Sequence, residues 1–194
     1  MSKLSLCVYC GSRVGNRPEF KRVAEHVGAL IGELGWRLVY GGGSSGLMGT
    51  VANAALACGA EVIGVIPRKL VDRELAHPGL TELQVVDTMH QRKTLMAEKS
   101  DAFLALPGGI GTFEEMFEVW TWRQLGYHDK PVALLNAGGY YDSLLAFLDH
   151  SVGAGFVNPS QRELLQVGTD AAELLPRLAQ HCALANAGDD YRSV

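Results

Sequence analysis

The sequence predicts an α/β fold, a Rossmann-like, doubly wound parallel sheet with helices on both faces. Short apolar runs of the kind that form buried strands alternate with longer stretches whose apolar residues recur at helical spacing. Repetition of strand, turn and helix is typical of parallel sheets covered by helices. Glycine clusters follow three of the expected strands, where such folds bind their ligands.

The elements follow in order along one domain, expected over residues 1–184, with a frayed polar tail over 185–194. Asn16 is the predicted N-cap of the first helix, and Pro18 lies in its first turn. Strands are expected over residues 4–9, 37–40, 61–66, 82–86, 102–106 and 131–135, and more weakly over 164–167. Helices are expected over residues 18–34, 46–57, 89–99, 112–125, 141–152 and 171–182.

Composition narrows the function classes. The net charge of −4 argues against a nucleic-acid partner or a membrane surface, since these partners select basic faces. We see no leader segment and no apolar stretch of membrane-spanning length, so we expect a cytoplasmic protein. Cys7 and Cys10 are spaced as C-x-x-C but lie within a predicted strand, where they point to opposite faces. With Cys58 and Cys182 they are expected to be unpaired thiols.

The stretch YGGGSSGLMG, residues 40–49, fits two motifs. Its glycines spell G-x-G-x-x-G, but a dinucleotide site also needs an acid at the end of the following strand, and Glu61 begins that strand. It also contains G-x-S-x-G around Ser44, the nucleophile pattern of serine hydrolases, without a convincing Asp and His at strand ends. The other interpretations are a close-packing turn and an anion site made of backbone amides.

The stretch PGGIGTFEE, residues 107–115, opens another helix. Thr112 and Glu115 have the spacing of a capping box, which would explain both without any function. A capping box does not explain why Gly108, Gly109 and Gly111 occur together. Successive glycines let backbone amides approach a ligand closely, so we expect an anionic group such as phosphate here.

A third stretch, residues 87–100, places two cations beside an apolar helix face. Met89, Lys93 and Met96 share this face, and Arg92 lies next to them. One interpretation is that the cationic heads reach water while their stems are buried. The other is an anion site built from Arg92 and Lys93.

PGGIGTFEE and MHQRK together resemble the paired motifs of the Lonely Guy (LOG) family. YCGSR, YGGGSSGLMG and TWRQLGYHDKPVALLN follow the order and spacing of that family over nearly the whole chain. The resemblance implies a Rossmann-like phosphoribohydrolase that cleaves a nucleoside 5′-monophosphate to the free base and ribose 5-phosphate. Its substrates would be cytokinin riboside monophosphates or AMP, which connects it with cytokinin biosynthesis and AMP nucleosidase activity. A homodimer is also implied.

The resemblance carries specific roles onto this chain. Arg92 and Glu115 would be catalytic. Substrate contacts would come from Glu74, Arg92, Lys93, Gly109, Ile110, Gly111, Thr112, Phe113, Glu114, Glu115 and Thr121. The glycine-rich loops add Gly11, Ser12, Gly42, Gly43 and Gly108 as candidates for holding phosphate or sugar. We expect no metal and no cofactor. In particular, we discount the lysine decarboxylase label that some relatives carry, because no lysine lies in a motif for a pyridoxal phosphate Schiff base.

Positive charge develops on the ribose as its bond to the base breaks, so the carboxylate of Glu115 is expected to face the sugar while the phosphate lies on nearby amides. An apolar stripe from Phe113 to Trp120, with Trp122 off it, suggests a surface for a second copy of the chain. The alternatives are a non-catalytic nucleotide or cofactor carrier on the same fold and an esterase that uses Ser44.

Overall fold

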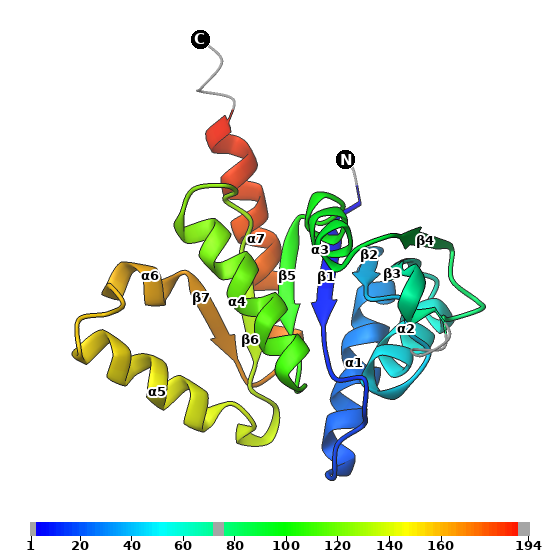
Figure 1. The fold of residues 1–194 in the computed structure, drawn as a ribbon, viewed down its shortest axis with the longest axis horizontal. Helices are drawn as coiled ribbons and strands as arrows, with labels where there is room; N and C mark the ends of the chain where they lie inside the picture. The colour runs from blue at the N-terminus through cyan, green and yellow to red at the C-terminus, as the bar shows by residue number, and fades with distance from the viewer. Residues whose placement is uncertain (1–2, 72–75, 190–194) are drawn as a thin grey trace.

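The computed structural model describes residues 3–71 and 76–189. Its centre is one seven-stranded sheet in the order β4-β3-β2-β1-β5-β6-β7, in which every pairing is parallel (Figure 1). The strands are β1 (Ser5–Tyr9), β2 (Arg37–Tyr40), β3 (Glu61–Pro67), β4 (Glu82–Val86), β5 (Ala102–Ala105), β6 (Val132–Leu135) and β7 (Leu165–Gly168). The α-helices are α1 (Pro18–Glu33), α2 (Gly46–Ala57), α3 (Met89–Glu98), α4 (Ile110–Gln124), α5 (Asp142–Gly153), α6 (Pro159–Glu163) and α7 (Ala171–Asp189).

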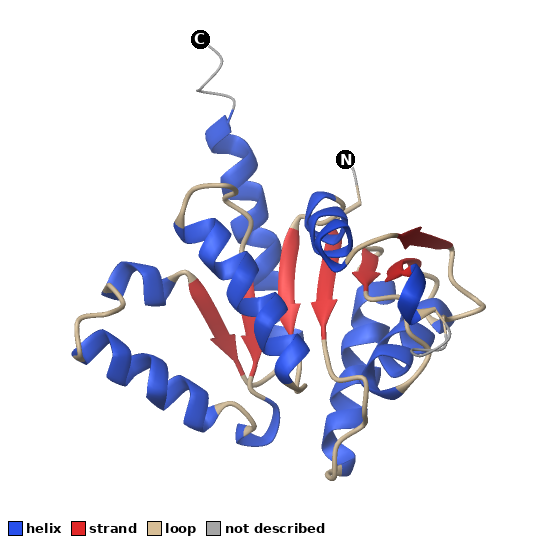
Figure 2. Cartoon of the chain, in the orientation of Figure 1, coloured by secondary structure: helices blue, strands red, loops and turns tan. Residues whose placement is uncertain are grey.

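Helices cover both faces of the sheet, which confirms the predicted fold class (Figure 2). Helices α1, α2 and α7 pack on one face through side chains such as Ile31, Val51 and Leu175. Helices α3, α4 and α5 pack on the other face. Cys7 belongs to the second core and Cys10 to the first, so these two thiols do point to opposite faces.

The strand order turns at β1. Strands β2 to β4 extend from one side of β1, and β5 to β7 extend from the other. The arrows of β1 and β5 point to the same edge of the sheet in Figure 2. In open parallel sheets the crevice outside the carboxyl ends of two such strands is the usual ligand site. The loops that follow β1 and β5 are therefore the first place to look for function.

Some predicted boundaries are wrong. Helix α1 has Arg17 rather than Asn16 at its N-cap position, without a side-chain cap. Helix α7 continues to Asp189, well past the predicted end and into the expected tail. Helix α6 and two 3-10 turns, Arg68–Leu70 and Ala137–Gly139, were not predicted. In the part of the chain that the structure describes, no helix combines the length and apolar character needed to cross a bilayer.

Candidate active site

Three glycine-rich loops, which follow the carboxyl ends of β1, β2 and β5, contact one another. The amide of Gly11 donates to the carbonyl of Pro107 at 3.1 Å, and the carbonyl of Gly11 accepts from Leu47 at 2.9 Å. Gly46 has a φ of +62°. A Cβ on it would overlap the backbone of Ser12. The loop after β1 is thus held between the start of α2 and the loop after β5, which fixes the floor of the site.

The glycines at the start of α4 have different roles. Helix α4 begins at Ile110 with Gly109 as N-cap, so Thr112 lies inside the first turn and the predicted capping box does not form. A Cβ on Gly108 would come within 2.7 Å of Thr112 Cβ and 2.9 Å of Gly11 N, so Gly108 is required by packing. A Cβ on Gly109 or Gly111 would meet no atom within 4 Å. Both residues therefore leave open space beside the first turn of α4.

Helix α3 brings Arg92 to the same edge. Thr88 caps this helix: its hydroxyl accepts from the amide of Gln91, and the Gln91 side chain accepts from the Thr88 amide. One turn later the guanidinium of Arg92 donates to the carbonyl of Val65 at 3.1 Å and to the carbonyl of Gly41 at 2.8 Å. Arg92 is only 5% exposed. Its head is buried and bound, so the interpretation that it reaches out to water is wrong.

These elements enclose a cavity of about 290 Å³. Arg92 and Glu115 both line it, Arg92 from α3 and Glu115 from the second turn of α4. The full lining is Cys10, Gly11, Ser12, Met48, Leu70, Met89, Arg92, Gly109, Ile110, Gly111, Thr112, Glu114 and Glu115. Most of the residues predicted to contact substrate thus meet in one cavity at the turning point of the sheet.

Other predicted site residues lie elsewhere. Gly42 and Gly43 are buried, and their carbonyls accept from His77 and Tyr40, so they face away from the cavity. Phe113 packs against the core beneath α4, and Thr121 lies exposed further along that helix. Lys93 does not line the cavity and is held by Glu114, which does, and by Glu118, which does not. Gly108 lines a neighbouring hollow. Glu74 lies outside the described residues.

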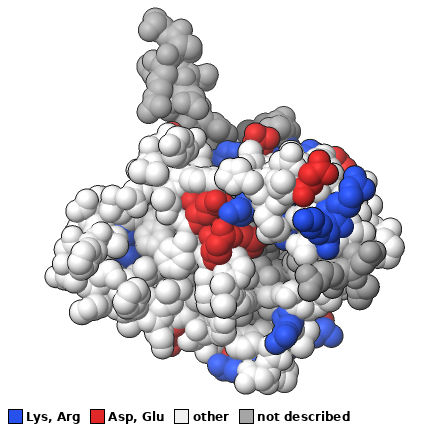
Figure 3. All heavy atoms as spheres, viewed as in Figure 1, with Lys and Arg blue, Asp and Glu red and all other residues white. Residues whose placement is uncertain are grey.

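Lys93 connects α3 to α4. Its ammonium donates to Glu114 at 2.5 Å and to Glu118 at 2.9 Å. Figure 3 shows acidic side chains gathered around a basic one near the middle of this face. Burial by itself lowers the pKa of Lys93, but the hydrogen bonds to the two carboxylates outweigh it, so the pKa is raised. Lys93 therefore stays charged and fixes the spacing of the two helices that carry Arg92 and Glu115.

The cavity also has an apolar wall that sequence reasoning missed. Cys10, Met48, Leu70 and Met89 form part of the lining, and Met89 Sδ lies 3.9 Å from Arg92 Nη1. Burial, followed by the nearby charge of Glu115, raises the pKa of the Cys10 thiol far above its ordinary value. Cys10 is therefore a neutral wall residue and not a nucleophile. Apolar runs alone could not distinguish these side chains from core residues.

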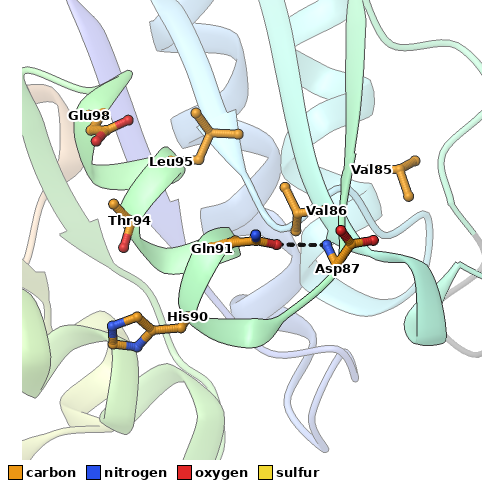
Figure 4. Close-up of a pocket in the computed structure, with 8 residues that line it drawn as sticks. All are labelled: Val85, Val86, Asp87, His90, Gln91, Thr94, Leu95 and Glu98. Atoms are coloured by element: carbon orange, nitrogen blue, oxygen red, sulfur yellow. Dashed lines mark hydrogen bonds between the residues drawn. The ribbon is translucent and has the colours of Figure 1, made fainter.

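Two further hollows are larger than this cavity, and one of them shares lining residues with it. One, of about 440 Å³, is lined by the loop after β1, by Phe20, Leu47 and Tyr140, and by residues of the loop after β5. The other, of about 460 Å³, lies between β4 and α3 (Figure 4). Figure 4 shows the Asp87 amide donating to the Gln91 side chain, and both residues line this hollow. The second hollow contains none of the predicted site residues.

The rival motifs find no support in the described residues. Glu61 pairs with Lys3 and Arg37 at the opposite end of the sheet, too far along its strand to serve a dinucleotide ribose. Ser44 does follow a strand and precede a helix, as a nucleophile would. A hydrolase would need a histidine bound to Ser44, but the ring nitrogens of His77, His128 and His181 bond to Asn53, to the Val119 and Arg177 carbonyls, and to backbone amides.

A family model described as "Possible lysine decarboxylase" matches residues 48–178. Decarboxylation of the usual kind needs pyridoxal phosphate bound to a lysine as a Schiff base. No lysine is among the described residues that line the cavity. Lys93, the nearest candidate on α3, has a raised pKa and is bound by two carboxylates, the opposite of what Schiff-base formation requires. The residues present do not fit that cofactor.

Solved structures with the same fold include a molybdenum cofactor carrier protein from Chlamydomonas reinhardtii, with a TM-score of 0.72 and 24% identity over 94% of this chain and 99% of that one. A molybdenum cofactor binding protein from Rippkaea orientalis is similar, with a TM-score of 0.71 and 22% identity over 93% of this chain and 98% of that one. At these identities the likeness establishes the fold.

Curated relatives are much more similar in sequence. The Arabidopsis thaliana protein named cytokinin riboside 5′-monophosphate phosphoribohydrolase LOG1 is 49% identical over 176 residues, which cover 91% of this chain and 83% of that protein. The Oryza sativa protein named probable cytokinin riboside 5′-monophosphate phosphoribohydrolase LOGL5 is also 49% identical over 91% of this chain and 72% of its own length. The chain thus belongs to the LOG family.

Proposed function

We propose that this chain is a phosphoribohydrolase that cleaves the N-glycosidic bond of a nucleoside 5′-monophosphate and releases the free base and ribose 5-phosphate. The observation that carries the proposal is the placement of Arg92 and Glu115 in one cavity beside two glycines that leave open space. The names of the relatives support the same reaction. A carrier would need the open glycines but not a carboxylate in the cavity wall.

Glu115 is proposed to act on the sugar. As the bond from C1′ to the base nitrogen lengthens, positive charge develops on the ribose ring, and a fixed carboxylate stabilises that charge. Water then adds its hydroxyl to C1′, and the remaining proton ends on the departing base. The apolar wall of Cys10, Met48 and Met89 lowers the local polarity, which strengthens the interaction between carboxylate and cation.

Arg92 is proposed to position the sugar and the carboxylate. Its guanidinium has five N–H donors, and the carbonyls of Gly41 and Val65 accept from two of its nitrogens, which fixes the plane of the group. A planar cation held in this way suits hydroxyl and carboxylate oxygens. The backbone of two neighbouring strands thus determines where the cation points.

Finer features extend the proposal. AMP and an adenine nucleotide with an apolar N6 substituent are both proposed substrates. A homodimer is proposed, since Leu83, Val85 and Met89 are exposed apolar side chains on β4 and α3. Trp122 does not contribute, because it packs against the core beneath α4. If the chain sediments as a monomer, the proposed dimer is ruled out. Cell fractionation tests the proposed cytoplasmic location.

The test compares two charge-neutralising variants on one helix. Glu115→Gln removes the carboxylate from the cavity, and Glu118→Gln removes a carboxylate one turn further on, outside it. Base release from AMP is measured by chromatography at saturating substrate. Turnover should fall about a hundredfold or more in Glu115→Gln. It should fall much less in Glu118→Gln, because the glutamine amide oxygen can still accept from Lys93 and keep the two helices in place. Full turnover by Glu115→Gln would overturn the proposed mechanism.

A further inference from the structure

We infer that His77 is a positioning residue for Arg92: it fixes the loop after β2, and this loop holds the guanidinium in the cavity. The inference rests on the proposed function, because it concerns how the same cavity keeps its cation in place. His77 lies outside the motifs that indicate the family, and it does not line the cavity. It therefore acts on the reaction only through Arg92.

The loop after β2 contacts Arg92 directly. The carbonyl of Gly41 accepts from Arg92 Nη2 at 2.8 Å. A Cβ on Gly41 would overlap the same nitrogen, so the guanidinium packs against the bare backbone of this residue. A shift of Gly41 therefore either moves the cation or breaks its hydrogen bond, and both change where the guanidinium points in the cavity.

The next residues of this loop are held by the segment that carries His77. The carbonyl of Gly42 accepts from the His77 amide at 2.9 Å, and Gly43 forms an antiparallel bridge with Ala76. Gly42 has a φ of +79°, so the chain turns sharply between the peptide that faces Arg92 and the one that faces His77. The position of Gly41 thus depends on residues 76–79.

The ring of His77 anchors this segment to α2. Its Nδ1 accepts from the Gly79 amide at 3.1 Å, so its proton is on Nε2, which donates to Asn53 Oδ1 of α2 at 3.0 Å. His77 is only 8% exposed. Only the neutral ring can make both bonds, because a proton on Nδ1 would face the N–H of Gly79. Protonation of the ring therefore loosens residues 76–79 and with them the bond to Gly42.

The surroundings keep the ring neutral. Burial lowers the pKa of His77. Neither α2 nor the loop after β2 contains a charged residue, and the hollow beside Asn53 is lined by Lys21 and Glu25 of α1, which pair at 3.5 Å. The other charged residues of the segment between β3 and β4 are Arg68 and Lys69, which are exposed, and Asp72, Arg73 and Glu74, which lie outside the described residues. The ring thus takes up a proton only below its ordinary pKa of about 6.5.

The experiment compares His77→Gln and His77→Ala with His128→Gln. His128 is a matched control because its Nδ1 also accepts from an amide two residues on, its Nε2 bonds to a carbonyl, and burial lowers its pKa. It precedes β6, however, and so lies at the edge of the sheet opposite the cavity. For each protein kcat and KM for base release from AMP are measured between about pH 5 and pH 8.

We expect His77→Ala to lower kcat about tenfold at neutral pH, because a displaced guanidinium lowers turnover. His77→Gln can still donate to Asn53, so it should recover most of this loss. In the unaltered chain kcat should fall as the pH drops below about 6.5, and part of this fall should be missing in His77→Gln, which takes up no proton. His128→Gln should keep the pH profile of the unaltered chain.

A second readout does not depend on the reaction. Exchange of the Arg92 guanidinium protons with solvent is followed by nuclear magnetic resonance, and it should become about tenfold faster in His77→Ala and stay the same in His128→Gln. An unaltered pH profile in His77→Gln, an equal change in His128→Gln, or unchanged exchange in His77→Ala would each overturn the inference. If exchange responds to His77 but the unaltered chain releases no base, the reaction is wrong and the positioning role stands. Normal base release with unchanged exchange gives the reverse result.

Discussion

Replacing the glycines at the start of α4 one at a time separates their roles in the fold and in the site. In Gly108→Ala the new Cβ would lie 2.7 Å from Thr112 Cβ and 2.9 Å from Gly11 N, closer than real Cβ contacts allow. Relieving this overlap moves backbone, so the free energy of unfolding should fall by about 2 kcal/mol. For a chain of this size the melting temperature should then fall by roughly 6 °C.

Gly111→Ala should behave in the opposite way. The new methyl meets no atom of the chain within 4 Å, and alanine is favoured over glycine in a helix by roughly 0.5–1 kcal/mol. The melting temperature should therefore stay the same or rise by about 2 °C. The methyl would fill space next to the substrate, so kcat/KM for base release should fall about a hundredfold.

The assay pairs thermal unfolding with base release from AMP for both variants. We expect a stable Gly111→Ala protein with low kcat/KM and a destabilised Gly108→Ala protein, because Gly108 is required by packing and Gly111 by the substrate. A Gly111→Ala protein with the unaltered kcat/KM would refute the reasoning, since the open glycine would then have no ligand beside it.

Three more outcomes follow from the contacts. Arg92→Ala leaves two buried carbonyls without their donor, so the free energy of unfolding, measured by chemical denaturation, should fall by about 2–4 kcal/mol. The same variant should release no base, as measured by chromatography. Lys93→Met should destabilise the chain at neutral pH, since it leaves the carboxylate of Glu118 unpaired in a partly buried place. Because the pKa of Lys93 is raised in the folded state, its stabilising effect is present below its ordinary value of 10.5 and is lost as the pH rises further, so the difference between the two proteins should shrink in alkali. His128 behaves in the opposite sense, because burial lowers its pKa and its Nδ1 accepts from the Lys130 amide only while it is neutral. The free energy of unfolding should therefore fall as the pH drops below about 6.5, and it should fall less steeply in His128→Gln. A parallel decline in both proteins would contradict this assignment.

Regular periodicity made most of the fold predictable. The strand bounds differ from the predicted ones by a residue or two, because buried parallel strands are short apolar runs bounded by turn residues. Helix α6 was missed because five residues are too few for a periodic pattern to emerge. The start of α4 was misplaced for a different reason. The glycines of residues 108–111 and Thr112 are all acceptable N-cap residues for α4, so the sequence does not distinguish them. The packing of Gly108 against the loop after β1 leaves Gly109 as the N-cap.

The site was predictable where it rests on motifs and not where it rests on packing. The motifs identified Arg92 and Glu115, and the structure places both in one cavity. Lys93 is adjacent to Arg92 in sequence, yet the helical turn of about 100° per residue sends it to the carboxylates of α4 instead. The apolar wall at Met48 and Leu70 comes from elements far apart in sequence, so no local pattern could assemble it.

The most direct test of the central claim is the identity of the products formed from isopentenyladenosine monophosphate and AMP. The purified chain is incubated with each nucleotide, and the products are separated by chromatography. We predict free base and ribose 5-phosphate in equal amounts, and neither product with Glu115→Gln. A nucleoside with inorganic phosphate, or no product from either nucleotide while AMP still binds, would contradict it.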